Sequence, residues 1–267
     1  MPHLSVIIPT WNRAHTISQA IQSVLNQTYT NLEVLVCDDG STDNTETIVK
    51  ALAETDSRIY WLPGKHSGKP AIVRNCGLKF STSPWVAFLD SDDYWLPKKI
   101  EQQFFLLERF HCRAACTNAL SVKPKEQIER VFFRELKEKI TFQDLLIGNG
   151  VICSSALVHR SVFETIGLFP EVDALGTLED YAFWLRVATQ TDFVYCAKPQ
   201  LVYRDNPQDS IRAHDLEQWV QRKIIFKDFL HWNQQQRKKQ PSIKKYSTAA
   251  RWRFWKEIYT HLHDKLK

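Results

Sequence analysis

Short apolar runs alternate with amphipathic stretches along the first 110 residues of the chain. Four runs rich in branched apolar residues have the length and composition of buried strands: 4–8, 32–37, 58–62 and 85–89. After each run, apolar residues recur at the three- and four-residue spacing of a helix, near 17–25, 48–52, 71–80 and 100–107. This alternation predicts an α/β fold with a mostly parallel sheet and helices on both of its faces.

The pattern is less regular beyond residue 110. Residues 118–140 are polar and charged, which indicates a loop or hairpin with a short helix. Further on we expect a strand region at 148–159, helices at 161–166 and 179–189, and strands at 193–196 and 201–203. From residue 205 the pattern is helical, with a basic, Gln-rich interruption at 235–241. We expect a main domain over residues 1–204 and a helical extension over 205–267.

The composition is that of an ordinary water-soluble protein. The 267 residues are 43% apolar and 24% charged, and a chain of this length can bury a sizeable core without covalent links. No apolar run approaches the roughly 18 residues that span a bilayer, and the N-terminus lacks the pattern of a signal peptide. The six cysteines include no CxxC pair, which argues against a zinc site or a disulfide framework. We therefore expect a cytoplasmic protein with reduced thiols.

Positive charge is concentrated in the extension. Residues 205–267 hold 14 Lys and Arg against 7 Asp and Glu, whereas the rest of the chain holds 21 against 23. A nucleic-acid-binding domain carries its basic patch on its own surface, so this distribution speaks against a nucleic-acid partner. The extension is also rich in tryptophan, with Trp219, Trp232, Trp252 and Trp255. For the segment Arg251–Lys256 in particular, two interpretations stay open: an interfacial helix on an anionic membrane, or a C-terminal helix docked on the domain with its basic face in solvent.

Polar motifs follow three of the four strands predicted in the first half. They are Pro9-Thr-Trp-Asn-Arg13, Asp38-Asp-Gly-Ser41 and Asp90-Ser-Asp-Asp93. The carboxyl ends of parallel strands meet at one edge of a sheet, where α/β proteins bind their ligands. We therefore expect these motifs to line a common site.

Asp90 and Asp92 are the candidate metal-binding pair. Two carboxylates two residues apart in such a turn can share a Mg²⁺ or Mn²⁺ ion and leave coordination positions for phosphate oxygens. Such an ion would neutralise the charge that develops when a nucleoside diphosphate departs. The alternative is an acidic turn that caps the following helix.

Asp39, Arg13 and Arg74 are candidates for binding a nucleotide. A carboxylate at the end of the second strand can accept hydrogen bonds from a base or a ribose; alternatively, the Asp38-Asp39 pair forms an Asx turn that opens the next helix. Both arginines are expected near the same sheet edge, and guanidinium groups suit a diphosphate. Ordinary solvation at the surface is the alternative for either arginine.

Glu179 and Asp180 begin the helix predicted at 179–189. Carboxylates at a helix N-terminus are favoured by the helix dipole, so a capping role is one interpretation. The other is that a carboxylate at the mouth of a cleft acts as a general base and removes a proton from an acceptor hydroxyl.

Together these segments resemble the family 2 glycosyltransferases, a large inverting group with the GT-A fold. The resemblance is carried by six segments: Val6–Arg13, Ser23–Tyr29, Glu33–Asp43, Arg74–Gly77, Phe88–Asp93 and Glu179–Arg186. The match is close to continuous over residues 4–110 and patchy over 150–204. Each motif is weak alone, and the order and spacing of all six make the match strong.

The resemblance implies a nucleotide-binding half over residues 1–110 and an acceptor half over 111–204. It also implies that Thr10, Arg13 and Asp39 hold the base and ribose of the donor. A UDP-sugar is the donor that the family most often uses, and a lipid-linked or cell-envelope saccharide is the expected acceptor.

The resemblance further assigns the reacting groups. Asp92 would bind the metal ion, Asp90 would lie close to the ribose or the metal, and Arg74 would lie near the donor. Asp180 would be the base in a single displacement that inverts the configuration of the anomeric carbon. With the basic extension, these features imply an enzyme that is cytoplasmic and associates with the inner face of a membrane.

The segments 66–71 and 167–171 depart from the usual family pattern. The chain also lacks the Gln-x-x-Arg-Trp segment and the transmembrane helices of processive polymer synthases, which favours transfer of one sugar per acceptor. A dinucleotide-dependent oxidoreductase is disfavoured because residues 9–13 contain no G-x-G-x-x-G. The other alternative is a catalytically inactive scaffold of the same fold that docks on a membrane or a protein. Such a scaffold need not retain the four acids that this chain has at positions 39, 90, 92 and 180.

Overall fold

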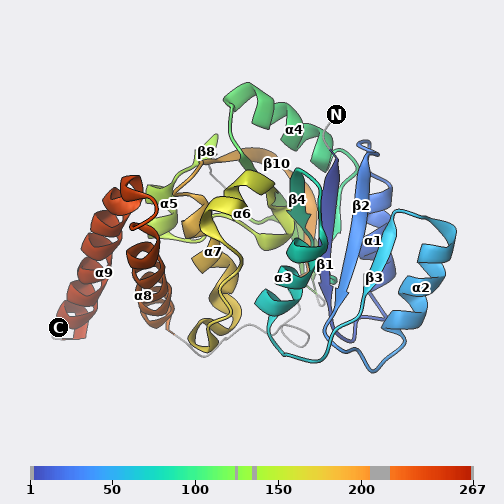
Figure 1. Cartoon of the computed structure of the whole chain (residues 1–267), viewed down its shortest axis with the longest axis horizontal. Helices are drawn as coiled ribbons and strands as arrows, with labels where there is room; N and C mark the ends of the chain where they lie inside the picture. Colours follow the sequence, from blue (N-terminus) through green and yellow to red (C-terminus); the bar gives the residue numbers. More distant parts are fainter. Residues whose placement is uncertain (1–2, 124–125, 134–136, 205–216, 266–267) are drawn as a thin grey trace.

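The computed structural model describes residues 3–123, 126–133, 137–204 and 217–265. Within these residues, a ten-stranded sheet carries helices on both faces (Figure 1). Its strands lie side by side in the order β3 (Ile59–Leu62), β2 (Leu32–Asp38), β1 (Leu4–Thr10), β4 (Trp85–Phe88), β9 (Leu157–His159), β6 (Ala114–Lys123), β10 (Phe193–Arg204) and β5 (Tyr94–Trp95). β7 (Glu126–Val131) pairs with β6, and β8 (Lys139–Ile140) pairs with β10.

Six of the strands run in the same direction. Parallel ladders join β3, β2, β1 and β4, and a further parallel ladder joins β6 to β10. The short strand β9 is antiparallel to both β4 and β6 and so connects the two parallel groups. The predicted α/β class and the mostly parallel sheet are confirmed.

Two hydrophobic cores flank the sheet, because successive side chains of a strand point to opposite faces. Val6 and Ile8 of β1 point to the face covered by α1 (Ile17–Leu25), α2 (Thr45–Thr55) and α4 (Lys99–Phe110). Ile7 points to the opposite face, which is covered by α3 (Pro70–Phe80), α5 (Phe142–Ile147), α6 (Arg160–Ile166) and α7 (Glu179–Val187).

The structure differs from the expectation over residues 118–159. Within 118–140, β6 and β7 form an antiparallel hairpin, which was one of the two forms expected, but the described part of this range contains no helix. The strand expected at 148–159 is confined to β9. It is preceded by a 3-10 turn at Cys153–Ser155, where the Ser155 hydroxyl donates to the carbonyl of Ile152 at 2.7 Å. Serine side chains that bind nearby backbone in this way compete with ladder formation.

A second difference concerns β10. The strands expected at 193–196 and 201–203 form one strand, and its register against β6 shifts between Cys196 and Leu201. Pro199 lies in this irregular stretch, and proline has no N–H to donate to a ladder. The proline therefore interrupts the pairing without ending the strand.

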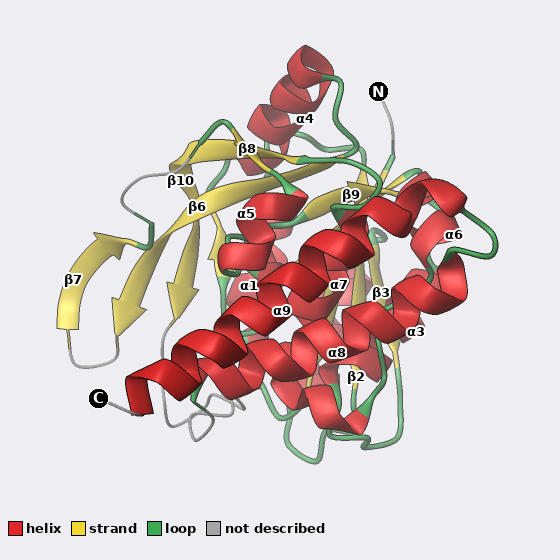
Figure 2. Cartoon of the chain, turned by 90° about the vertical axis from the view of Figure 1, so that its left-hand side faces the viewer, coloured by secondary structure: helices red, strands yellow, loops and turns green. Residues whose placement is uncertain are grey.

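The helical extension forms two long helices, α8 (Gln218–Gln236) and α9 (Lys244–Lys265), which run antiparallel beside each other (Figures 1 and 2). α8 packs on α7, where it buries Ile225, Phe226, Phe229 and Trp232 in the core. Arg186 of α7 and Asp228 of α8 form an ion pair at 2.7 Å. Part of α9 is docked as well, since Ala250 is buried and the rings of Tyr246 in α9 and Phe142 in α5 have centroids 4.7 Å apart. The domain boundary at residue 204 stays a prediction, and residues 205–216 lie outside the described part. No helix within that part is long and apolar enough to cross a membrane.

Gly77 lets α3 approach β1 and β2 closely. A Cβ at this position would lie 2.8 Å from Cγ2 of Ile7 and 2.9 Å from Sγ of Cys37. Because both contacts are in the core, we expect Gly77→Ala to lower the free energy of unfolding by about 1–3 kcal/mol, measured by urea denaturation. Gly148→Ala is the matched control: its backbone is extended, its Cβ meets no atom within 4 Å, and it should change the value by less than about 0.5 kcal/mol. Equal midpoints for the two variants would contradict the prediction.

Candidate active site

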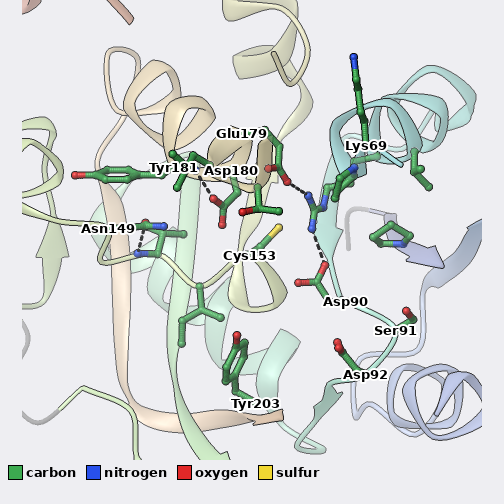
Figure 3. A pocket seen from close by; sticks show the side chains of 18 of the residues that line it. Lys69, Asp90, Ser91, Asp92, Asn149, Cys153, Glu179, Asp180, Tyr181 and Tyr203 are labelled. Carbon is green, nitrogen blue, oxygen red and sulfur yellow. Dashed lines mark hydrogen bonds and ion pairs between the residues drawn. The ribbon is translucent and has the colours of Figure 1, made fainter. Parts of the chain in front are cut away.

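A cleft of about 920 Å³ opens at the carboxyl ends of β1, β2 and β4. One wall carries the loops that follow these strands. The opposite wall carries the start of α7, with Glu179 and Asp180 (Figure 3), and the first turns of α8 also line the cleft. The cleft is lined by all seven residues to which the sequence assigned a role: Thr10, Arg13, Asp39, Arg74, Asp90, Asp92 and Asp180.

At one end of the cleft, Asp39 holds a loop in place. Its carboxylate accepts hydrogen bonds from the N–H groups of Ser67 and Gly68, at 2.8 and 2.9 Å, and from the Ser67 hydroxyl at 2.7 Å. This anchoring places His66 of the same loop against Trp11, with ring centroids 4.6 Å apart and planes 23° apart. The buried Thr10 hydroxyl beside them has no hydrogen-bond partner among the described residues. This end therefore offers flat rings and a polar floor.

The carboxylates of Asp38 and Asp39 have different surroundings. Asp38 forms the turn: its carboxylate accepts from the N–H groups of Gly40 and Ser41, both at 2.9 Å. Asp39 takes no part in that turn and lines the cleft instead.

Three acids follow β4, and only two of them line the cleft. Asp93 is buried and accepts hydrogen bonds from the Ser154 hydroxyl at 2.5 Å and from the backbone N–H of Arg204 at 2.9 Å. Asp90 and Asp92 lie on the same wall of the cleft (Figure 3). Burial raises the pKa of Asp92, the charge of Asp90 adds to the rise, and the Arg13 guanidinium opposes it.

The described residues contain no group of three acid, histidine or cysteine side chains that could hold a metal ion. Asp90 and Asp92 therefore form a donor set of two carboxylates facing open space. That set fits Mg²⁺ or Mn²⁺, which often take one or two carboxylates from the protein and their other ligands from water and substrate phosphates. The raised pKa of Asp92 also fits, because a divalent cation would relieve the repulsion between the two acids.

Arg74 is buried and bridges the two walls of the cleft. One Nη donates to Oδ1 of Asp90 at 2.7 Å and the other donates to Oε1 of Glu179 at 2.5 Å. The adjacent Asn75 also reaches across: its side chain exchanges hydrogen bonds with the backbone of Phe169, at 2.9 and 3.0 Å. Through these hydrogen bonds Arg74 positions Asp90 and Glu179, and its Nε is buried without a hydrogen-bond partner among the described residues. Its expected place near the donor stays a prediction.

Asp180 lies across the cleft from Asp92 (Figure 3). Its carboxylate accepts a hydrogen bond from the N–H of Tyr181 at 2.5 Å. Burial raises the pKa of Asp180 to about 7, and the charge of Glu179 contributes to the rise. A carboxyl group with this pKa can take up a proton near neutral pH.

Several lining residues were not predicted from the sequence: His66, Arg204, Gln218, Gln221 and Arg222. Trp11 lies within a motif that was expected to line the site, and Glu179 belongs to the acidic pair expected at the mouth of the cleft. The residues of α8 carry no local signal, because only the packing of α8 on α7 brings them to the cleft. Arg204 is likewise placed by the pairing of β10.

Removing Arg74 should be costly because it leaves two acids without their cation. We expect Arg74→Met to lower the free energy of unfolding by about 3–5 kcal/mol. Burial already raises the pKa of Glu179, and Arg74 opposes that rise. When the pKa of a carboxyl group is higher in the folded than in the unfolded protein, its ionisation lowers the free energy of unfolding as the pH rises. The destabilisation by Arg74→Met should therefore be greater at pH 8 than at pH 5.

Urea denaturation at both pH values would test this. Arg74→Met/Glu179→Gln should recover part of the loss, since the buried charge is removed with its partner. Arg58→Met, which breaks the more exposed Arg58–Asp56 pair, is the control and should cost less than about 1 kcal/mol. A loss for Arg74→Met that is the same at both pH values would contradict the assignment.

Known proteins share both the sequence pattern and the fold. The family model for glycosyl transferase family 2 matches residues 5–167. Two Escherichia coli proteins, the UDP-Glc:alpha-D-GlcNAc-diphosphoundecaprenol beta-1,3-glucosyltransferases WfgD and WfaP, are 32% and 34% identical to the chain. The matches cover 85% and 71% of this chain and 86% and 72% of the two relatives.

A similar fold occurs in Staphylococcus aureus TarS, whose structure was solved in complex with UDP-GlcNAc. The two structures superpose with a TM-score of 0.69 at 19% identity, over 92% of this chain and 73% of the other. The family match and the named relatives favour an enzyme over an inactive scaffold. The chain belongs to the family 2 glycosyltransferases, and it is a glycosyltransferase with the GT-A fold.

Proposed function

We propose that this enzyme transfers one sugar from a UDP-sugar to a hydroxyl group of a lipid-linked saccharide, with inversion at the anomeric carbon. The observation that carries the proposal is the arrangement of acids in one cleft: Asp39 at one end, Asp90 and Asp92 on one wall, and Asp180 on the other. WfgD and WfaP support the choice of substrates, since both are named for a UDP-Glc donor and a diphosphoundecaprenol-linked acceptor.

The nucleotide is assigned to the end of the cleft that contains Trp11 and His66. A flat base can stack against these rings, and the Thr10 hydroxyl is available as a polar partner. Asp39 contributes by fixing the loop of His66 and by placing negative charge near the ribose hydroxyls. Arg13, whose Nη2 lies 4.0 Å from Oδ2 of Asp92, is the cation that would contact the ribose or diphosphate.

A Mg²⁺ or Mn²⁺ ion would be held by Asp92, with Asp90 beside it. Bound there, the ion would supply charge neutralisation to the departing diphosphate. Arg74 keeps Asp90 in place on the same wall. The opposing charge of Arg13 helps Asp92 to stay ionised.

Asp180 is assigned as the general base. It takes the proton of the acceptor hydroxyl, and the hydroxyl oxygen forms its bond to the anomeric carbon as the bond from that carbon to the diphosphate oxygen breaks. Because Asp180 lies across the cleft from Asp92, attack and departure occur on opposite faces of the sugar, which inverts the configuration. The Arg74–Glu179 ion pair positions the start of α7 and therefore the base.

The acceptor would enter beside α7 and α8, which form the wall opposite the nucleotide end. An acceptor joined to lipid through a diphosphate is membrane-bound, so the reaction would take place at a membrane surface. We place the enzyme in the cytoplasm, peripheral on the inner face of the membrane, in the synthesis of a cell-envelope or extracellular saccharide.

Donor binding can be tested by thermal shift with UDP, GDP, dTDP and CDP, each with and without Mn²⁺. We expect UDP to raise the melting temperature only when Mn²⁺ is present, because the two carboxylates and the diphosphate share the ion. Asp92→Ala should abolish this shift. Asp56→Ala removes an acid paired with Arg58 outside the cleft and should leave the shift unchanged. Stabilisation by UDP that is independent of both Mn²⁺ and Asp92 would contradict the metal assignment.

Asp180→Asn should lower the transfer rate by about 10³-fold while it leaves the UDP-dependent thermal shift intact. In the wild type, kcat/KM should fall tenfold per pH unit below about 7, because the base must be ionised. The pKa of an unfolded aspartate is about 3.9, so ionisation of Asp180 costs stability as pH rises from about 4 to 7. Asp180→Asn should therefore melt at or above the wild-type temperature at pH 8. A rate within tenfold of wild type would exclude Asp180 as the base.

A further inference from the structure

Three large aromatic side chains project into solvent from one face of α9. Trp252 and Trp255 are each 65% exposed and Tyr259 is 70% exposed. Their spacing of three and four residues places them on the same side of the helix. The side of α9 that packs on the protein is a different one, where Ser247 and Ala250 are buried. The three aromatic side chains therefore lie on the side of α9 away from these buried residues.

Basic residues border the aromatic face on both sides. At 100° per residue, Lys245 and Lys256 fall on one flank of the three aromatics, and Lys244 and Arg251 fall on the other. All four side chains are exposed, and Nζ of Lys256 lies 5.2 Å from the ring centroid of Trp252. An aromatic ridge between two basic flanks matches the interface of an anionic bilayer. There the indole rings enter the headgroup region while the cations meet lipid phosphates.

The position of α9 relates this face to the active site. α9 lies along α8, and the first turns of α8 line the cleft with Gln218, Gln221 and Arg222. In Figure 1, α8 begins and α9 ends on the side of the molecule where β1 ends. Residues that follow β1 line the cleft on that side. Figure 2 shows α9 as the outermost element on this face of the protein. A surface that contacts α9 would therefore border the cleft on its acceptor side.

We infer that the face of α9 formed by Trp252, Trp255, Tyr259 and the four flanking cations binds an anionic phospholipid surface and holds the cleft beside it. The positive charge of this face favours an anionic lipid surface. Binding to an apolar protein partner or to a second copy of this chain would not require four cations around three aromatic rings. Lipid binding by this face does not depend on the identity of the substrates. Its value for catalysis rests on the lipid-linked acceptor proposed above, because surface binding brings enzyme and acceptor into the same layer.

The test is co-sedimentation of the full chain with vesicles of pure phosphatidylcholine or of phosphatidylcholine mixed with phosphatidylglycerol. The wild type should sediment with the anionic vesicles only, and added salt should weaken its binding. An aromatic variant, Trp252→Ser/Trp255→Ser/Tyr259→Ser, should lower the partition coefficient at least tenfold. A charge variant, Lys245→Gln/Arg251→Gln/Lys256→Gln, should do the same.

The matched control is Tyr60→Ser/Phe80→Ser, which removes two exposed aromatics near the β3 edge of the sheet, 41% and 51% exposed. It should bind vesicles like the wild type. Melting temperatures, and the thermal shift with UDP and Mn²⁺, should be the same for all variants, so a failure here is distinct from a failure of the donor site.

Two results would overturn the inference. One is equal sedimentation of the wild type and both α9 variants. The other is no vesicle binding by the wild type together with a concentration-dependent dimer, seen by size-exclusion chromatography, that the aromatic variant abolishes. The second result would assign the face to another copy of the chain.

Discussion

The buried bridge from Asp90 through Arg74 to Glu179 determines the shape of the active site. Arg74 belongs to a helix of the first half of the chain, Asp90 follows a central strand, and Glu179 begins a helix of the second half. A guanidinium group with two nearly fixed directions for donation sets the distance between these elements. The hydrogen bonds of Asn75 to the Phe169 backbone reinforce the same connection one residue further along α3. Arg74 and Asn75, which begin the Arg74–Gly77 motif, therefore connect the two halves of the chain.

Arg74 also affects the pKa values of the acids in the cleft. Burial raises the pKa of both Glu179 and Asp180, and the charge of Arg74 opposes that rise in each. Burial also raises the pKa of Asp92 on the other wall, where the charge of Arg13 opposes it. The cleft therefore holds acids that burial makes harder to ionise, and the pKa of Asp180 is raised to about 7.

The first half of the fold could be predicted from the sequence because its strands and helices are local patterns. Each buried strand is a short branched apolar run, and each polar motif directly follows one, so sheet topology alone brings Thr10, Asp39 and Asp92 to one edge. The second half could not be predicted as well. Its strands are interrupted by a serine side chain that binds nearby backbone and by Pro199, so their apolar runs are short and the strand bounds are hard to read from the pattern. The partner of Arg74 and the residues that α8 places in the cleft are set by packing between helices. A single sequence does not reveal those contacts.

The cleft is built from two different kinds of structure: loops that follow the central strands, and the surface of a helix. The end proposed for the nucleotide is formed by loops that directly follow the central strands, and Asp39 fixes one of these loops through hydrogen bonds to Ser67 and Gly68. The wall formed by the first turns of α8 is a helix surface, where Gln218 is exposed and Gln221 and Arg222 are half-buried. With the acceptor placed there as proposed, substitutions on this surface would change which saccharide fits and leave the proposed donor end as it is. Proteins with this architecture would then diverge in acceptor choice while they keep the same donor chemistry.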